Sequence, residues 1–243
     1  MLYDSLEDCY VQTSLGRMHY KLHAGKPAIV FLHGFGASTL SYKKLVEQLP
    51  DDVGACLIDL LGHGESDAPR IEYTIGRQAQ AVKEVTQSLS LQDSYLFGNS
   101  YGGWIAASIA QGNYKGRGII LEDAMGLKEI FDDIEKQGNV EEWKRNWMAK
   151  ALVFNPKDWV IRSAVNDQPT GEFLTKESLS GIVKPCLILW GENDRTLDVK
   201  YAKLFSEYIK GSVLEIIQGA EHVAHYTHAN EVSHQLLKFI GMI

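Results

Sequence analysis

Residues 93–104 read DSYLFGNSYGGW, and this stretch decides the fold. An apolar run typical of a buried strand ends in a G-x-S-x-G motif at Gly98–Gly102, and an alanine-rich segment up to residue 111 predicts a helix directly after it. Glycine at both ends of the motif permits a turn tight enough to hold Ser100 in a strained backbone conformation with its hydroxyl exposed. A serine presented between a strand and a helix in this way is predicted to act as a nucleophile.

Strand and helix patterns alternate on both sides of this stretch. Compact apolar runs predict buried strands, and segments with apolar residues at helical spacing predict the helices between them. The predicted strands include AIVFLHG (28–34), GACLIDL (54–60) and GRGIILED (116–123), and the predicted helices cover 38–49, 75–89 and 102–111. A hairpin over residues 10–22 precedes them. This order indicates the α/β class, with a mostly parallel central sheet flanked by helices.

The alternation stops between residues 124 and 183. This interval has a helical pattern and is rich in aromatic residues, namely Phe131, Trp143, Trp147, Phe154, Trp159 and Phe173. The run KPCLILWGEND (184–194) then restores the buried-strand pattern, and a helix, a strand and a last helix complete the chain. We therefore predict an α/β core made of residues 1–123 and 184–243, with a small helical cap inserted at 124–183.

Composition excludes several classes of function. The chain has 243 residues and a net charge of −7, so it lacks the basic stripe that would neutralise phosphates, and nucleic acid is not an expected partner. Its cysteines, Cys9, Cys56 and Cys186, are scattered, which argues against a disulfide framework or a thiolate zinc site. No apolar stretch reaches the length of a membrane span, and a soluble, cytoplasmic protein is expected. The oligomeric state cannot be predicted.

Five short motifs follow one another in a recognisable order. They are HGFG (33–36), DLLGHGES (59–66), GNSYG (98–102), WGEND (190–194) and GAEH (219–222). With these motifs in this order over nearly its whole length, the chain resembles the α/β-hydrolase superfamily. The resemblance implies a catalytic triad in the chain order serine, acid, histidine.

His222 is the predicted general base. A serine hydroxyl is a weak nucleophile at neutral pH and needs a neighbouring group that accepts and returns a proton. His222 follows the last predicted strand, where a loop at the carboxyl edge of a parallel sheet can reach the serine turn. The family pattern favours it over its neighbours His225 and His228.

The orienting carboxylate has two candidates, each at the end of a predicted strand. Asp194 follows CLILW and agrees with the family's chain order. Asp123 ends GIILED and is the alternative acid, because some members of the superfamily carry the acid there. Glu192 and Asp198 are interpreted as solvated loop charges.

The resemblance also implies an oxyanion hole. In this fold the donors are the backbone N–H after the nucleophile and another in the loop after the first buried strand, here those of Tyr101 and Phe35. His33 is interpreted as a structural residue of that loop. The GHGES turn is interpreted as shaping the base of the site, without catalytic roles for His63 or Ser66.

Ester hydrolysis is the leading hypothesis for function. Serine in place of aspartate as nucleophile argues against the alkyl-ester chemistry of related dehalogenases and epoxide hydrolases, and leaves an acyl-enzyme route. We predict a small-molecule ester substrate with a small to medium apolar acyl group, bound with help from cap aromatics. This chemistry requires no metal and no organic cofactor.

Three alternatives stay open. Asn99 before the serine resembles the corresponding turn of carbon–carbon hydrolases that act on ring-fission products. Some members of this fold only bind ligands without turnover. His222, His225 and His228 are spaced by three residues, so a metal site on one helix face is a further possibility.

Overall fold

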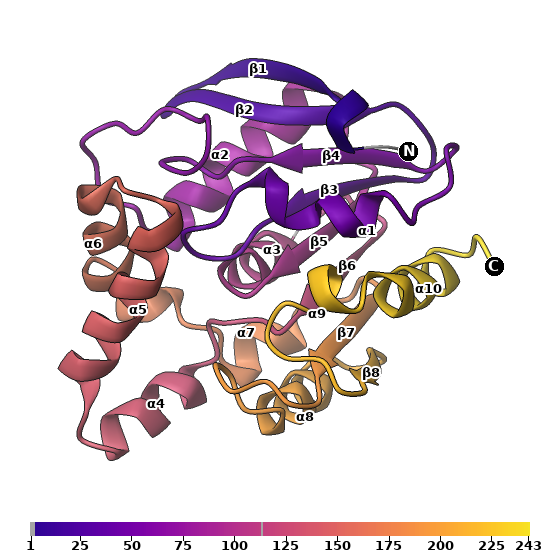
Figure 1. Cartoon of the computed structure of the whole chain (residues 1–243). Helices are drawn as coiled ribbons and strands as arrows, with labels where there is room; N and C mark the ends of the chain where they lie inside the picture. Colours follow the sequence, from indigo (N-terminus) through magenta and orange to yellow (C-terminus); the bar gives the residue numbers. More distant parts are fainter. Residues whose placement is uncertain (1–2, 113) are drawn as a thin grey trace.

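The computed structural model describes residues 3–112 and 114–243, which form one eight-stranded sheet with helices on both faces (Figure 1). The strands are β1 (Glu7–Thr13), β2 (Gly16–His23), β3 (Ala28–Leu32), β4 (Gly54–Ile58), β5 (Tyr95–Asn99), β6 (Gly118–Glu122), β7 (Cys186–Gly191) and β8 (Val213–Ile217). Their spatial order is β1-β2-β4-β3-β5-β6-β7-β8. β2 pairs antiparallel with β1 and β4, and every other neighbouring pair is parallel. The predicted fold class is confirmed.

The central strands are buried on both faces. All residues of β4, β6 and β7 are buried, as expected for near-continuous apolar runs in a parallel sheet covered by helices. One face packs against α2 (Ile75–Ser88), α3 (Tyr101–Ala110) and α8 (Lys200–Tyr208). The other packs against α1 (Lys43–Val46) and α10 (Ala229–Phe239). Because β5, β6 and β7 run parallel, their carboxyl ends lie at one edge of the sheet, where their loops meet.

The segment between β6 and β7 is helical. It forms α4 (Lys128–Lys136), α5 (Val140–Phe154), α6 (Asp158–Asn166), a 3₁₀ turn η3 (Thr170–Glu172) and α7 (Lys176–Ser180). α7 contacts α8 of the core, whereas α4, α5 and α6 stand beside the sheet's loop edge (Figure 1). We call α4–α6 the cap helices. All three lie within the 124–183 interval expected to form the cap.

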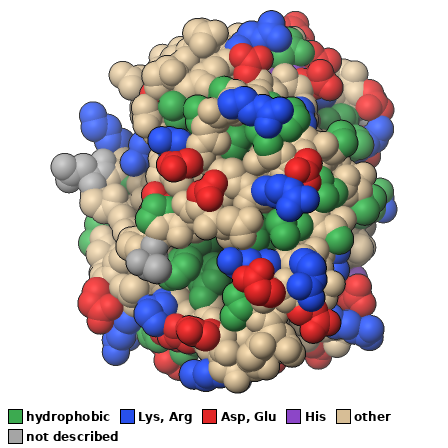
Figure 2. All heavy atoms as spheres, turned by 90° about the vertical axis from the view of Figure 1, so that its left-hand side faces the viewer, with side chains coloured by type: hydrophobic (Ala, Val, Ile, Leu, Met, Phe, Trp, Pro, Cys, Tyr) green, Lys and Arg blue, Asp and Glu red, His purple; other side chains and the backbone are tan. Residues whose placement is uncertain are grey.

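The cap helices rest directly on core loops. Gly36 has a positive φ of 77°, and a side chain there would collide with Ala151 of α5. The side-chain amide of Asn155 donates to the carbonyl oxygen of Gly62 at 3.0 Å. On the face turned toward the viewer in Figure 2, acidic and basic side chains are interspersed with hydrophobic ones, a mixture that does not favour binding to a phosphate backbone.

The segment predicted as one helix over 38–49 differs in the structure. It begins with a 3₁₀ turn η2 (Thr39–Tyr42) and continues as the single-turn α1. The backbone N–H of Thr39 donates to the buried carboxylate of Asp59 at 2.7 Å, and this tertiary bond fixes the start of the segment. The remaining short elements are η1 (Tyr3–Ser5) and α9 (Ala224–Thr227).

Within residues 3–112 and 114–243, the helices are all too short or too polar to cross a bilayer.

Candidate active site

Ser100 occupies the sharp turn between β5 and α3. Its φ is 52° and its ψ is −111°, a conformation that is rare for a residue with a side chain. The backbone N–H of Ser100 donates to the carbonyl oxygen of Glu122 at 2.9 Å, which fixes the turn against the end of β6. A side chain at Gly102 would collide with the carbonyl oxygen of Leu32, so only glycine allows α3 to start this close to β3.

His222 lies between Ser100 and Asp194. Its Nε2 is 3.0 Å from Ser100 Oγ, and its Nδ1 is 2.7 Å from Asp194 Oδ2. The three residues come from loops after β5, β7 and β8, so the sheet edge brings together positions up to 122 residues apart. Because Asp194 is acceptor-only when ionised, Nδ1 carries the proton and Nε2 faces the serine hydroxyl as an acceptor.

Asp194 is held by its own turn. Its second oxygen, Oδ1, accepts backbone N–H groups from Thr196 at 2.7 Å and Leu197 at 2.9 Å. These bonds orient the carboxylate so that Oδ2 faces the imidazole. The side chain has 0% exposure, whereas that of His222 is 19% exposed.

Asp123 sits beside this pair in a different environment. It is fully buried and has a positive φ of 45°. Its Oδ1 accepts the N–H of Gly191 at 2.8 Å, and its Oδ2 has no hydrogen-bond partner in the described part of the chain. Burial, followed by the nearby carboxylates of Glu122 and Asp194, raises the pKa of Asp123 well above its ordinary value. Burial therefore favours the neutral form of Asp123, whereas the Asp194 carboxylate accepts the hydrogen bond from His222.

The predicted oxyanion donors belong to Tyr101, the residue after Ser100, and to Phe35 in the loop after β3. Tyr101 opens α3, where backbone N–H groups have no acceptor within the helix. Among the described residues, the backbone N–H of Phe35 does not donate to another protein group. The rings of Phe35 and Tyr101 are 5.5 Å apart, which places the two residues next to each other at the site.

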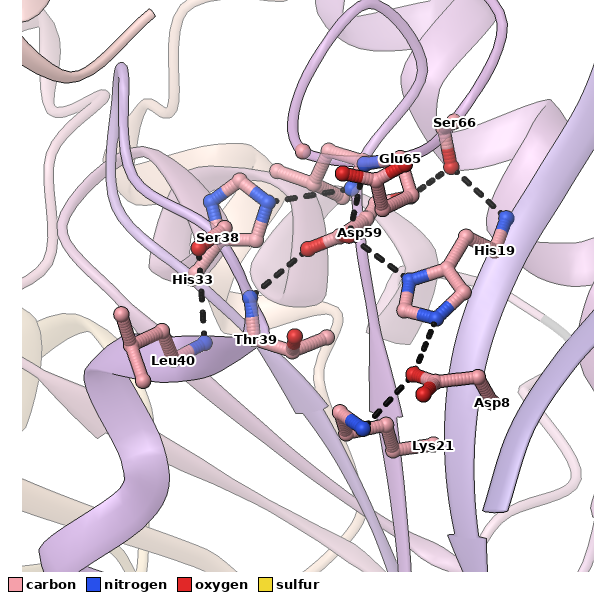
Figure 3. Close-up of polar contacts among 12 residues, drawn as sticks. Asp8, His19, Lys21, His33, Ser38, Thr39, Leu40, Asp59, Glu65 and Ser66 are labelled. Carbon is pink, nitrogen blue, oxygen red and sulfur yellow. Dashed lines mark hydrogen bonds and ion pairs between the residues drawn. The ribbon is translucent and has the colours of Figure 1, made fainter. Parts of the chain in front are cut away.

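A buried carboxylate supports the loop that carries Phe35. Asp59 accepts the N–H of Thr39, the N–H of Glu65 at 2.9 Å and a bond from His19 Nδ1 at 2.7 Å (Figure 3). Burial would lower the pKa of His19, but hydrogen bonds to Asp59 and Asp8 outweigh it and raise that pKa above its ordinary value. The two carboxylates therefore favour the protonated form of the His19 imidazole.

The two other histidines near the loop have structural contacts. His33 Nδ1 donates to its neighbour's carbonyl oxygen at Gly34, and Nε2 accepts the N–H of Leu60 at 3.1 Å (Figure 3). Burial lowers the pKa of His63 to about 3, so its ring stays neutral. Ser66 Oγ donates to the carbonyl oxygen of Asp59 at 2.6 Å. Each of these side chains contacts the backbone of the loops and not Ser100.

An aromatic cavity of about 270 Å³ lies between the cap helices and α3. Its walls include Trp104, Phe131, Trp143, Trp147 and Phe173. The ring of Phe35 is 4.9 Å from that of Trp147, so the aromatic surface continues from the cavity to the residue that follows His33-Gly34.

Trp159 has a different environment from the cavity tryptophans. The guanidinium of Arg70 lies 4.1 Å above its ring, outside this cavity. The aromatic residues of this segment therefore differ in environment: Phe131, Trp143, Trp147 and Phe173 line the cavity, Trp159 packs against Arg70, and Phe154 is 78% exposed. The sequence pattern does not distinguish these environments.

Comparison with known proteins identifies the family. A sequence model described as "Alpha/beta hydrolase family" matches residues 29–235. The chain belongs to the alpha/beta hydrolase family. This α/β-hydrolase is 24% identical over 261 residues to "Monoacylglycerol lipase abhd6-A" of Xenopus laevis, covering 90% of this chain and 75% of the lipase.

Two other relatives add detail. A "Putative 2-succinyl-6-hydroxy-2,4-cyclohexadiene-1-carboxylate synthase" of Bacillus subtilis is 40% identical over 114 residues, covering 45% of this chain and 41% of that protein. The solved esterase EaEST of Exiguobacterium antarcticum superposes with a TM-score of 0.79 at 20% identity, covering 97% of this chain and all of that one. At this identity the superposition establishes the shared fold.

The three-histidine metal hypothesis does not agree with the structure of this α/β-hydrolase. His225 is fully buried against Glu122, His228 Nδ1 is 2.9 Å from Thr227 Oγ1, and His222 faces Ser100. In the described residues, the candidate set of metal ligands is Asp123, Asp194 and His222, with ligand atoms within 4.8 Å of one another. A metal there would have to displace the hydrogen bond between His222 and Asp194.

Sequence reasoning missed the pairing of Glu122 with His225. A glutamate at the end of a buried apolar strand was the available signal, because a buried charge requires a partner. The partner lies 103 residues away, and no sequence spacing indicates it.

Proposed function

We propose that this protein hydrolyses carboxylic esters through an acyl-enzyme, with Ser100 as nucleophile, His222 as general base and Asp194 as the orienting carboxylate. The observation that supports this most is the continuous chain of hydrogen bonds from Asp194 through His222 to Ser100, at 2.7 and 3.0 Å. The distance between Ser100 Oγ and His222 Nε2 lies within the range in which a base can take a hydroxyl proton, and the bond to Asp194 orients the imidazole.

The proposed reaction has two halves. Ser100 Oγ attacks the ester carbonyl carbon while its proton passes to His222 Nε2, and the oxyanion is held by the N–H groups of Phe35 and Tyr101. The carbon–oxygen bond to the alcohol then breaks, and the imidazolium returns its proton to the departing oxygen. Water attacks the acyl-enzyme by the same route in the second half, releasing the acid and the free serine.

The cavity supports a substrate with a small to medium apolar acyl group. Its volume of about 270 Å³ and its aromatic walls suit such a group, and the wall residue Trp147 packs against Phe35, which carries one of the proposed oxyanion donors. Two of the similar proteins, named as a monoacylglycerol lipase and an esterase, also agree with an ester substrate.

Carbon–carbon cleavage and the synthase reaction receive less support. Asn99 is the residue that suggested carbon–carbon hydrolysis. Its side-chain nitrogen donates to Glu122 and to the carbonyl oxygen of His222, so these hydrogen bonds are made within the protein and not to a substrate. A substrate with several carboxylates, as in the synthase's name, would need cations. The cavity lining contains one, Lys144, and also the carboxylate of Glu135.

The decisive experiment is intact-mass analysis after treatment with a fluorophosphonate, with Ser100→Ala as the matched control. One adduct that maps to Ser100, together with turnover of p-nitrophenyl esters, is the expected result. An adduct without turnover on any ester would replace ester hydrolysis by carbon–carbon cleavage or ligand binding. Absence of an adduct would overturn the assignment of an activated serine.

A further inference from the structure

Glu122 connects the serine turn to the histidine loop. It is the last residue of β6, is fully buried, and its carbonyl oxygen accepts the N–H of Ser100 at 2.9 Å. Its side-chain Oε1 accepts the backbone N–H of His225 at 2.7 Å. One residue therefore binds the backbone of the nucleophile on one side and, on the other, the backbone three residues after His222.

His225 completes a buried pair with this carboxylate. Its ring has 0% exposure, and its Nδ1 donates to Glu122 Oε2. The ring of Tyr42 packs on it with centroids 4.5 Å apart, and Nε2 has no hydrogen-bond partner among the described residues. The imidazole is thus fixed by one hydrogen bond and by aromatic packing, and it has no direct hydrogen bond to the serine.

Asn99 also links Glu122 to the loop that carries His222. This residue precedes the nucleophile, and its Nδ2 donates to Glu122 Oε2 at 3.0 Å and to the carbonyl oxygen of His222 at 3.3 Å. The amide therefore bridges the serine turn and the backbone of the predicted general base. Glu122, His225 and Asn99 form a network, which we call the loop clamp, beneath the hydrogen bond between Ser100 and His222.

Stability alone is a weak explanation for the loop clamp. A buried ionic or strongly polar group costs desolvation, and replacing such a pair by apolar residues is often neutral or stabilising. A rigid set of bonds that fixes two reacting groups has a direct catalytic use, because a displacement of about 1 Å can reduce a rate about a hundred-fold.

We propose that Glu122 and His225 are positioning residues that hold the His222 loop at hydrogen-bonding distance from Ser100. This inference rests on the proposed function for its kinetic consequences. It predicts that weakening the clamp lowers the rate of the chemical steps and leaves substrate binding unchanged.

The variant pair His225→Leu and His225→Asn tests this prediction. Leucine removes the donor to Glu122, so kcat and the rate of fluorophosphonate labelling should both fall on the order of a hundred-fold, with KM within about three-fold. Asparagine carries an N–H close to the position of Nδ1 and should restore most of the loss. Val85→Ala, a buried change in α2, serves as the control that lowers thermal stability without lowering kcat.

Glu122→Gln gives a second test if the leucine variant does not fold. Glutamine has the shape of glutamate but a single acceptor oxygen for the three donors that Glu122 now accepts. We expect a fall in kcat of about ten-fold or more. A folded Glu122→Gln or His225→Leu protein with the parent's kcat would overturn the proposal, even if its melting temperature were lower.

A proton NMR measurement separates this proposal from the proposed function. The Nδ1 proton of His222, bonded to Asp194, is identified by its loss in His222→Ala. Its signal should shift or broaden in His225→Leu and be retained in His225→Asn, whether or not the protein turns over esters. An unchanged signal in His225→Leu would overturn the positioning role. Failure of the parent to label or turn over would overturn only the hydrolase assignment.

Discussion

The loops after β6 and β7 each place an aspartate near the same imidazole, and they give the two carboxyl groups opposite properties. Asp194 accepts two backbone N–H groups at Oδ1 and a bond from His222 at Oδ2. Asp123 accepts the N–H of Gly191 and is buried beside other carboxylates, which raises its pKa well above the ordinary value. We therefore expect the hydrogen bonds to each carboxylate, and not proximity to a histidine alone, to determine which aspartate acts with His222.

The largest loss of kcat should come from replacing Ser100 or His222, the two residues to which the hydrogen bonds of Asp194 lead. Ser100→Ala and His222→Ala should each lower kcat for p-nitrophenyl esters about a thousand-fold or more, because the nucleophile and its base act as a unit. Circular dichroism should show an unchanged fold. Substantial turnover by the alanine variant at 100 would mean that another residue attacks the ester.

Asp194→Asn should have the next largest effect. The amide keeps the shape but can no longer stabilise the imidazolium or fix its tautomer, so kcat should fall about a hundred-fold or more. The same measurement on Asp123→Asn provides the matched control. If the change at 123 were the more damaging, the comparison between the two loops would be reversed and Asp123 would be the acid.

A change in the cap should separate substrate binding from chemistry. Trp147→Ala enlarges the cavity next to Phe35 without touching the loops after β6 and β7. KM for hexanoyl esters should rise on the order of ten-fold, while acetyl esters should be affected little. Equal losses for short and long acyl groups would show that the cavity does not bind the acyl chain.

The smallest kinetic effect is expected for Asp123→Asn, within about three-fold at neutral pH, but this variant should change the pH dependence of stability. A raised pKa in the folded state means that the unfolded chain loses this proton first, above about pH 4. The parent therefore loses stability relative to Asp123→Asn as pH rises from about 4 toward the folded-state pKa. Melting temperatures between pH 4 and 8 measure this, and a constant difference would contradict a neutral Asp123.

Much of the site could be predicted from the sequence because each motif follows a buried strand. The carboxyl ends of parallel strands meet at one edge, so Ser100, Asp194 and His222 were expected to converge. The same rule places Asp123 at that edge and cannot separate it from Asp194. The choice between the two aspartates depends on the turn at Thr196 and Leu197, whose N–H groups orient the carboxylate of Asp194 and not that of Asp123.

Other features could not be predicted because they depend on contacts between distant segments. The segment at 38–49 has the apolar spacing of one helix, but the bond from Thr39 to Asp59 produces a 3₁₀ turn. The hydrogen bond between Glu122 and His225 cannot be predicted from the sequence, because only the residue types at the two positions hint at it. Patterns along the chain therefore predict which residues reach the sheet edge, but not which of them bind each other.

The hydrogen bonds of Asp59 affect how easily the β1–β2 hairpin separates from the edge of the sheet. Edge hairpins commonly fray, and their amide hydrogens then exchange with solvent well before the whole protein unfolds. Here His19, in the middle of β2, binds the carboxylate that also accepts the N–H groups of Thr39 and Glu65 (Figure 3). Separating the hairpin from the sheet would break the bond between His19 and Asp59 and would leave the backbone N–H of Asp59 without its acceptor, the carbonyl oxygen of His19. Amide exchange at β2 should therefore track global unfolding, so that the first strands of the chain report on the cooperativity of the whole domain.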